Sequence, residues 1–225
     1  MKKRYAVVPL DPLFLFPKFV SMKYMNQKIQ KVLGELKGKR IGCFIDNANW
    51  FYPQRELGWR VSFRKLTSLF EDCSQSLVSR IYAGTPLISN DRKKFLEFSH
   101  TVEEIGFTLI TKPLKKIWID NPKTTFQYKC NFDVEIALDV ARTIDQIDCV
   151  IIGSGDSDFL EVKRFALERK KKFIVLCFEQ GVSWEMRKCH RIFLEGIQSV
   201  IIQEAQKKPQ HLRAGVSKTR KSIPQ

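Results

Sequence analysis

The stretch DCVIIGSGDSDF, residues 148–159, decides how the rest of this sequence is interpreted. It begins with a run of apolar residues that has the length and composition of a strand buried on both faces. It then changes at once to glycine, serine and two acids, Asp156 and Asp158. The stretch RIGCFIDNAN, residues 40–49, has the same arrangement, with an apolar run that ends in Asp46. Both stretches therefore predict a buried strand that is followed by an acidic loop.

Other apolar runs of strand length follow along the chain, and helical patterns separate most of them. Strands that alternate with helices of ten to fifteen residues indicate right-handed βαβ units. The sequence therefore predicts an α/β fold with a mostly parallel central sheet of about five strands. The expected strands cover residues 40–46, 77–83, 107–111, 148–152 and 173–178, with a short last candidate at 192–194.

The expected helices come from apolar residues at helical spacing and from residues that cap helices. Phe63, Leu66 and Leu69 give one such pattern, and Gly106 is suited to end another helix after a cap at Asn90 or Asp91. Between the third strand and the next helix, the segment 113–122 is basic and proline-bounded, and we expect it to be an irregular linker. The expected helices cover residues 62–76, 90–105, 133–144, 159–170 and 183–188.

The two acidic loops predict a binding site, because ligands of open α/β sheets bind beyond the carboxyl ends of the strands. If the two strands are neighbours, Asp46, Asp156 and Asp158 face one another at this edge. Crowded carboxylates repel one another and favour a compensating cation. Hard oxygen ligands select Mg²⁺ or Mn²⁺ over zinc. The alternative for a single aspartate is helix capping, and Asp158 is placed to cap a helix that begins at Phe159.

A third acidic segment lies between Lys129 and Asp139. Asp133 opens the expected helix, where a negative charge also suits the helix dipole, and we assign it to the metal site. Asp139 lies six residues further on, roughly 9 Å along the helix axis, so it does not easily reach the same ion. Its alternatives are a second metal, an outer position around the first, or a plain solvated face. Lys129 is either a phosphate contact or an ordinary exposed lysine.

Other residues near these acids have supporting roles or exclude other chemistries. Gly153 and Gly155 allow a tight turn, and we expect Ser154 to hold the loop by hydrogen bonds. The three histidines form no spaced pair, which argues against a zinc enzyme or a histidine-based hydrolase. The Gly-Ser-Gly run lacks the third glycine of the dinucleotide fingerprint. A phosphatase with two aspartates after its first strand is disfavoured, because Asn47 and Ala48 follow Asp46.

The chain carries a net charge of +15, and most of this charge lies at its two ends. Residues 1–40 have a net charge of +8 and residues 203–225 one of +5. Such ends suit a polyanion such as nucleic acid, and the alternative is a solubilising role. We expect a basic extension over residues 1–39, one α/β domain over 40–202 and a basic disordered tail over 203–225. A start at Met22 or Met25 is the alternative for the N-terminal part.

The cysteines and the apolar runs bear on the compartment of the protein. Six cysteines form no C-x-x-C pair, and several lie inside apolar runs, as expected for reduced thiols in the cytoplasm. No uninterrupted apolar run is long enough to span a membrane, so we expect no membrane partner. A homodimer is compatible with the sequence but is not determined by it.

Three motifs in order resemble the NYN domain family, a branch of the PIN-like nucleases, over about residues 40–200. The LabA-like bacterial and archaeal branch is the most similar. Departures are modest, since Cys130 and Ser157 stand where glycine is common in the family. The three motifs are Phe44-Ile45-Asp46 with Asn49, Lys129 with Asp133-Val134 and Asp139, and Gly153-Ser154-Gly155-Asp156-Ser157-Asp158-Phe159. The later Gly181-Val182-Ser183 is a further point of similarity.

The resemblance implies a PIN-like α/β/α sandwich and Mg²⁺-dependent cleavage of phosphodiester bonds, usually in RNA. It implies that Asp46, Asp133, Asp156 and Asp158 are the catalytic acids and the metal ligands. It also implies that Asn49 orients Asp46 or the substrate, and that Asp139 is the family's second helical acid. The rival hypothesis is an RNA-binding or regulatory module that keeps the acids without catalysis.

The expected substrate path consists of basic and aromatic side chains. Basic groups at residues 92–94, 112–116 and 169–172 would neutralise the RNA backbone along a groove. Trp118 and Tyr128 either stack unpaired bases, which would favour single strands, or pack at the sheet edge.

Overall fold

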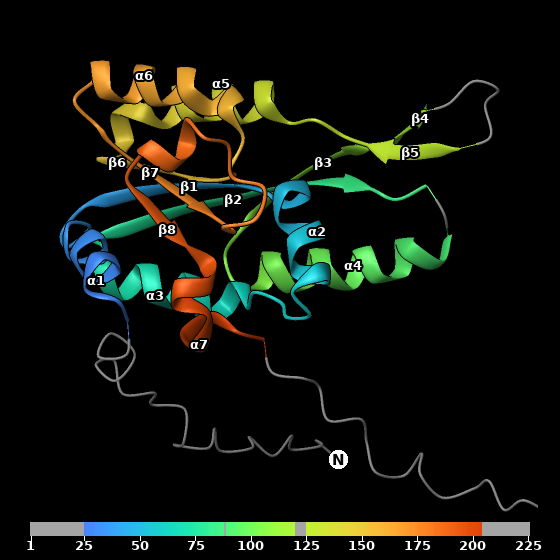
Figure 1. The fold of residues 1–225 in the computed structure, drawn as a ribbon, viewed down its shortest axis with the longest axis horizontal. Coiled ribbons are helices and arrows are strands. Elements are labelled where there is room, and N and C mark those ends of the chain that lie inside the picture. The colour runs from blue at the N-terminus through green and yellow to red at the C-terminus, as the bar shows by residue number, and fades with distance from the viewer. Residues whose placement is uncertain (1–24, 88, 120–124, 204–225) are drawn as a thin grey trace, which may run out of the picture.

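The computed structural model describes residues 25–87, 89–119 and 125–203. It confirms the predicted α/β/α sandwich, with one parallel sheet between two layers of helices (Figure 1). The sheet has six strands in the order β3-β2-β1-β6-β7-β8, one more than the predicted number of about five. The strands are β1 (Arg40–Asp46), β2 (Ser76–Thr85), β3 (Thr108–Pro113), β6 (Cys149–Gly153), β7 (Lys172–Cys177) and β8 (Arg191–Phe193).

The central strands are buried on both faces because their side chains alternate between two cores. Ile41, Cys43 and Ile45 of β1 point into one core, whereas Phe44 points into the other. The near-continuous apolar runs of the sequence are therefore those of strands covered by helices on both sides. The order along the sheet reverses at β1 and β6, since the chain first builds outward from β1 to β3 and then returns to β6.

The helices divide into two layers, one on each face of the sheet (Figure 1). Apolar side chains of α1, α3, α4 and α7 belong to one core, and those of α5 and α6 belong to the other. The first layer contains α1 (Gln27–Gly34), α3 (Phe63–Cys73), α4 (Ser89–Glu104) and the short α7 (Gln198–Ile201). The second layer contains α5 (Asp133–Thr143) and α6 (Leu160–Glu168). The described residues also form four short 3-10 turns, which are η3 (Ile144–Gln146), η4 (Ser157–Phe159), η5 (Met186–Lys188) and η6 (Leu194–Ile197).

Three parts of the chain differ from the expectations. The expected N-terminal extension includes α1, which packs on the core through Ile29 and Leu33. Helix α2 (Asn47–Glu56) was not predicted, because it contains Pro53 and little amphipathic pattern, yet Asp46 caps it. The expected linker at 113–122 instead contains β4 (Lys115–Trp118), which pairs with β5 (Phe126–Lys129) in an antiparallel hairpin.

Two further features concern the cysteines and the lengths of the helices. All six cysteines are free, and five of them are buried. Among the residues that the structure describes, no helix is both long enough and apolar enough to cross a membrane. The basic tail that we expect over residues 203–225 lies outside the described residues, apart from Gln203.

Candidate active site

The two acidic loops lie side by side at the carboxyl edge of the sheet. Strands β1 and β6 are parallel neighbours, and Ile45 is paired in register with Gly153. The residue after Ile45 is Asp46, and the residues after Gly153 lead to Asp156. Asp46 therefore lies next to the loop that carries Asp156, as the sequence predicted.

Asp46 ends β1 and caps the helix that follows it. Its Oδ1 accepts a hydrogen bond of 3.0 Å from the backbone N–H of Ala48 and so caps α2. Burial raises the pKa of Asp46 to about 6, and the charges of Asp133 and Asp156 add to this effect. Backbone N–H groups of Ala48 and Asn49 oppose it only in part. Asp46 is thus a carboxylate whose ionised form gains from a nearby cation.

The loop after β6 is held by its own side chains. The Ser154 side chain is fully buried, and its Oγ accepts a hydrogen bond of 3.2 Å from the backbone N–H of Asp156. Asp156 Oδ1 in turn accepts one of 3.1 Å from the N–H of Asp158. Asp156, rather than Asp158, is therefore the capping residue of the turn that precedes α6. The alternative in which Asp158 caps a helix is therefore excluded, and Asp158 is exposed at the edge of the site.

Asn49 joins the two loops. Its Oδ1 accepts a hydrogen bond of 3.0 Å from the backbone N–H of Gly155, so its amide orients the acidic loop rather than the side chain of Asp46. Gly155 also allows a close approach of a third segment, since a Cβ at this position would lie 2.8 Å from the Cα of Val182. The N–H of Ser183 donates to the carbonyl of Gly155 at 2.9 Å. The segment 181–183 therefore supports the acidic loop from behind.

Asp133 joins the site from the start of α5. Its backbone N–H donates to Asn131 Oδ1 at 2.8 Å, and the Asn131 amide donates back to the Asp133 carboxylate. Burial raises the pKa of Asp133, and the charges of Asp156 and Asp158 raise it further, whereas Asn131 lowers it. The four predicted acids are thus close enough to act on one another electrostatically. Asn131 is a positioning residue that the sequence interpretation did not identify.

Asp139 does not belong to this group of acids. It is buried, and its Oδ2 contacts Arg80 Nη1 at 2.8 Å and accepts a hydrogen bond of 2.8 Å from the Tyr82 hydroxyl. Its Oδ1 lies 3.2 Å from Arg142 Nη1. Burial would raise the pKa of Asp139, but these hydrogen bonds and charges hold it below the ordinary value. Of the three alternatives given for Asp139, these contacts exclude the solvated face, and Asp139 instead connects α5 to β2.

The basic groups expected along a substrate groove do not lie together. Residues 169–172 run from the end of α6 to the first residue of β7, at the amino edge of the sheet and opposite the acids, because α6 runs back along the sheet. There Lys172 Nζ contacts Glu35 Oε2 at 2.8 Å. Residues 112–116 instead run from the carboxyl end of β3 into β4, and Lys129 is exposed on β5. The expected groove therefore cannot include 169–172.

The four aspartates present a donor set of oxygen atoms, which suits Mg²⁺ or Mn²⁺ and does not suit a thiolate site for zinc. Their mutual effect on pKa indicates a local excess of negative charge. Among the described residues, however, no three Asp, Glu, His or Cys side chains already converge closely enough to hold an ion. The oxygen donors of the four aspartates nevertheless fit a divalent metal, and these are the residues that would hold it.

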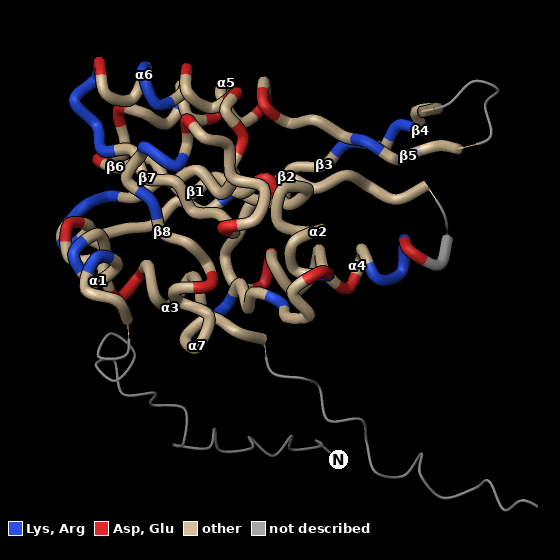
Figure 2. Tube along the Cα trace, in the orientation of Figure 1, with Lys and Arg blue, Asp and Glu red and all other residues tan. Residues whose placement is uncertain are grey.

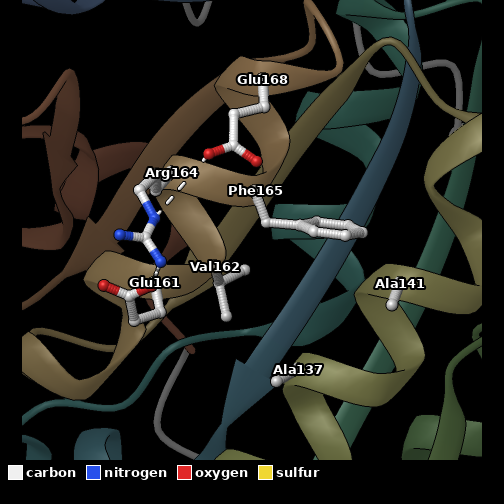
Figure 3. A pocket seen from close by; sticks show the side chains of 7 residues that line it. All are labelled: Ala137, Ala141, Glu161, Val162, Arg164, Phe165 and Glu168. Atoms are coloured by element: carbon white, nitrogen blue, oxygen red, sulfur yellow. Dashed lines mark ion pairs between the residues drawn. The ribbon is translucent and has the colours of Figure 1, made fainter.

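Two surface hollows differ in their relation to the acids. One, of about 290 Å³, lies between α5 and α6, where Arg164 forms ion pairs with Glu161 and Glu168 (Figure 3). Its other walls are apolar, and none of the four acids lines it. The second, of about 320 Å³, borders the acidic loops because it includes Asn49 and Gly181. Its lining residues are Ala48, Asn49, Tyr52, Pro53, Glu56, Gln180 and Gly181.

Comparison with known proteins agrees with this geometry. The family model described as "NYN domain" matches residues 40–195, from the start of β1 to just beyond β8. The chain belongs to the NYN domain family. The match covers all three acidic segments and the supporting segment 181–183. Membership in this family establishes a nuclease-like fold and leaves catalysis as a separate question.

Two individual relatives place this NYN domain more closely. The chain is 26% identical over 148 residues to the "Low amplitude and bright protein LabA" of Synechococcus elongatus, which covers 66% of this chain and 78% of that protein. This supports the LabA-like branch. A crystal structure of a protein of unknown function from Vibrio parahaemolyticus is similar with a TM-score of 0.58 and 25% identity. The similarity covers 74% of this chain and 97% of that one.

Proposed function

We propose that this NYN protein is a divalent-metal-dependent ribonuclease that hydrolyses phosphodiester bonds, with single-stranded RNA as its substrate. The observation that carries the proposal is the placement of four aspartates at the carboxyl edge of the sheet. They come from three separate parts of the chain, the ends of β1 and β6 and the start of α5. Residues 1–24 and 204–225 lie outside the described part and do not enter the argument.

The roles of the side chains follow from their environments. Burial raises the pKa of Asp46 to about 6, so its ionised form gains from a nearby cation. Asp133 faces the same space from α5, held by Asn131, and Asp156 and Asp158 complete the set from the β6 loop. When bound, Mg²⁺ or Mn²⁺ supplies Lewis acidity, which activates water for attack on phosphorus and neutralises charge on the phosphodiester. None of the four acids is needed as a covalent nucleophile.

The surroundings of the acids fit a polyanionic substrate. A cluster of carboxylates repels phosphate unless a cation bridges them, so metal and RNA should bind together. The hollow that includes Asn49 and Tyr52 lies beside the acidic loops and can take a part of the substrate next to the cleaved bond. The six free thiols suit a reducing compartment, and we propose that the protein acts in the cytoplasm.

The acid cluster predicts an unusual dependence of stability on pH. The pKa of Asp46 is about 6 in the folded chain, above its ordinary value of 3.8, so the native state favours the protonated form. This contribution is complete below about pH 4 and is lost as the pH rises through about 6. Without metal, the melting temperature should fall between about pH 4 and 7, as at most about 3 kcal/mol of stability disappears. A thermal melt in chelator measures this directly.

Asp46→Asn and added metal provide the controls for this prediction. The variant has no charge at this position, so its melting temperature should depend less on pH over the same range, with the raised pKa of Asp133 as the remaining contribution. Mn²⁺ or Mg²⁺ should restore the wild-type melting temperature at pH 7 in a dose-dependent way, because it binds the native state preferentially. Zn²⁺ need not do so. If neither ion changes the melting temperature of the wild-type chain, the proposed metal site is wrong.

Turnover itself is tested by cleavage of labelled single-stranded RNA in the presence of Mn²⁺. The rival function is an RNA-binding module that retains the acids. The observation in its favour is that, in the described part of the chain, no three Asp, Glu, His or Cys side chains lie close enough together to hold a metal ion. RNA binding without any cleavage product would establish that rival and overturn the proposed activity.

A further inference from the structure

The β4–β5 hairpin is the feature of this fold that the sheet and its helices do not explain. It extends from the end of β3 and returns to the start of α5, and it projects beyond the carboxyl edge of the sheet (Figure 1). An isolated two-stranded hairpin is marginally stable in water, so an exposed one usually has a partner. The described residues of the two strands, together with Ile119, form what we call the hairpin arm.

One face of the hairpin arm is aromatic. Lys116 is paired with Tyr128, and Trp118 with Phe126, so these four side chains share a face. The three aromatic rings contact one another. The centroids are 5.7 Å apart for Trp118 and Phe126, across the two strands, and 5.4 Å apart for Phe126 and Tyr128, along β5. Trp118 and Phe126 remain 40% and 42% exposed. Large rings that stay this exposed form a platform rather than a core.

The same face carries a cation. Lys116 Nζ lies 4.2 Å from the centroid of the Trp118 ring and 3.9 Å from that of Phe126. Alternating aromatic rings and amines of this kind suit stacked bases joined by phosphates. A purely apolar protein partner would have to bury this amine, at a cost that a phosphate would avoid.

The opposite face of the hairpin arm brings two like charges together. Lys115 is paired directly with Lys129 across the two strands, an arrangement that destabilises a hairpin by itself. Within the described part of the chain, neither lysine forms an ion pair, in contrast to Lys112, whose Nζ lies 2.6 Å from Glu135. The repulsion between Lys115 and Lys129 would be relieved by a bound anion, and a second copy of this positive arm would increase it.

The base of the hairpin arm adjoins the acids. Gly84, near the end of β2, lets both ends of the arm approach β2, because a Cβ there would clash with Cδ2 of Leu114 and lie 3.2 Å from the Cβ of Cys130. Burial raises the pKa of the Cys130 thiol, and the charge of Asp46 is among the smaller contributions. Only Cys130, Asn131 and Phe132 separate Lys129 from Asp133. A nucleic-acid strand bound to the arm would therefore lead directly to the proposed site of cleavage.

We propose that the hairpin arm binds single-stranded RNA, with unpaired bases stacked on Trp118, Phe126 and Tyr128 and with phosphates attracted by Lys116 on that face and by Lys115 and Lys129 on the opposite face. This inference rests on the proposed function, because it supplies that site with its substrate class. Stacking on an exposed platform requires bases that are free of a duplex, so the arm selects single strands. Figure 2 shows the basic segments of the arm on the side of the molecule where the sheet ends.

The test measures RNA binding by the full chain in chelator, so that no cleavage can occur. The probe is a fluorescein-labelled, U-rich single strand of about 20 nucleotides, compared with a duplex of the same length. Trp118→Ala and Phe126→Ala should each weaken binding of the single strand by about fivefold or more, as expected when a stacked base has no ring beneath it. Trp118→Phe should retain most of the affinity, because it keeps a ring. Binding of the duplex should be weak and little changed.

A second pair of variants protects the test against misfolding of the hairpin. Lys115→Gln with Lys129→Gln removes charge without removing a ring, and it should flatten the salt dependence by about 0.7 for each phosphate that is no longer neutralised. The matched controls are Leu167→Ala and Lys170→Gln, which alter exposed residues at the far end of α6 and after it. Both controls should bind like the wild-type chain.

The outcomes separate this inference from the proposed activity. Wild-type affinity in all the hairpin variants would overturn the inference and leave the nuclease proposal standing. A change in sedimentation mass, with RNA affinity unchanged, would show that the arm joins two copies of the chain and would overturn it as well. Weaker RNA binding in the hairpin variants, with a wild-type chain that binds RNA but never cleaves it, would support the arm and overturn the nuclease.

Discussion

Asp156→Asn should reduce RNA cleavage on the order of a thousandfold while the fold remains intact. The loss is large because a carboxylate that helps to hold a catalytic cation contributes several kcal/mol of transition-state stabilisation. The fold should survive because an asparagine Oδ1 can still accept the hydrogen bond from the N–H of Asp158. Removing one charge also relieves the repulsion that acts on Asp46 and Asp133. Single-turnover cleavage and a thermal melt of the same preparation measure the two effects.

Asp145→Asn is the matched control for that substitution. Asp145 is exposed in η3, before β6, and therefore lies at the amino edge of the sheet, opposite the acids. The control should cleave RNA at the wild-type rate. Wild-type turnover by the Asp156→Asn protein would show that the acid cluster is not the catalytic site.

Arg80→Ala should destabilise the folded chain by about 3 kcal/mol without touching the site. Breaking a largely buried ion pair leaves an uncompensated charge, which costs about 3–5 kcal/mol when the pair is fully buried. Here the side chains of Arg80 and Asp139 are 23% and 12% exposed, and Arg142 still contacts Asp139, so we expect the lower end of that range. Chemical denaturation of the wild-type and variant chains, each in chelator, measures the difference.

Arg142→Ala provides a sharp comparison, because it removes the other arginine of the same carboxylate. The Arg142 side chain is 68% exposed, so its ion pair is screened by water and should contribute less than about 1 kcal/mol. Equal destabilisation by the two substitutions would contradict the structural role that we assign to Asp139 and Arg80.

The fold was largely predictable because its strands are apolar on both faces. The runs at 40–46 and 148–152 allow no half-exposed strand, and their pairing follows from the α/β alternation. Helix α2 could not be predicted in this way, since its only buried residue is Trp50 and it contains Pro53. The hairpin was missed because its strands are short and their rings are exposed, so the usual burial pattern of a strand is absent.

The site was predictable in its acids but not in the groups that hold them. Asp46, Asp133, Asp156 and Asp158 stand at the ends of elements, where a sequence pattern places them well. The hydrogen bond from Gly155 to Asn49 joins residues 106 positions apart, and no local pattern reports it. The partners of Asp139 could not be predicted for the same reason, because Arg80 and Tyr82 come from a distant strand. Long-range contacts of this kind follow from the packing of α5 on the sheet.

The most direct test of the central claim is the metal dependence of RNA cleavage by the wild-type chain beside Asp46→Asn. Labelled single-stranded RNA is incubated with each protein in Mn²⁺, in Ca²⁺ and in chelator. We predict cleavage by the wild-type chain in Mn²⁺, little in Ca²⁺, which accepts looser geometry and acidifies water less, and none in chelator or with Asp46→Asn. Equal product from both proteins under all conditions would reveal a contaminating nuclease, and no product under any condition would contradict the claim that this NYN domain is an enzyme.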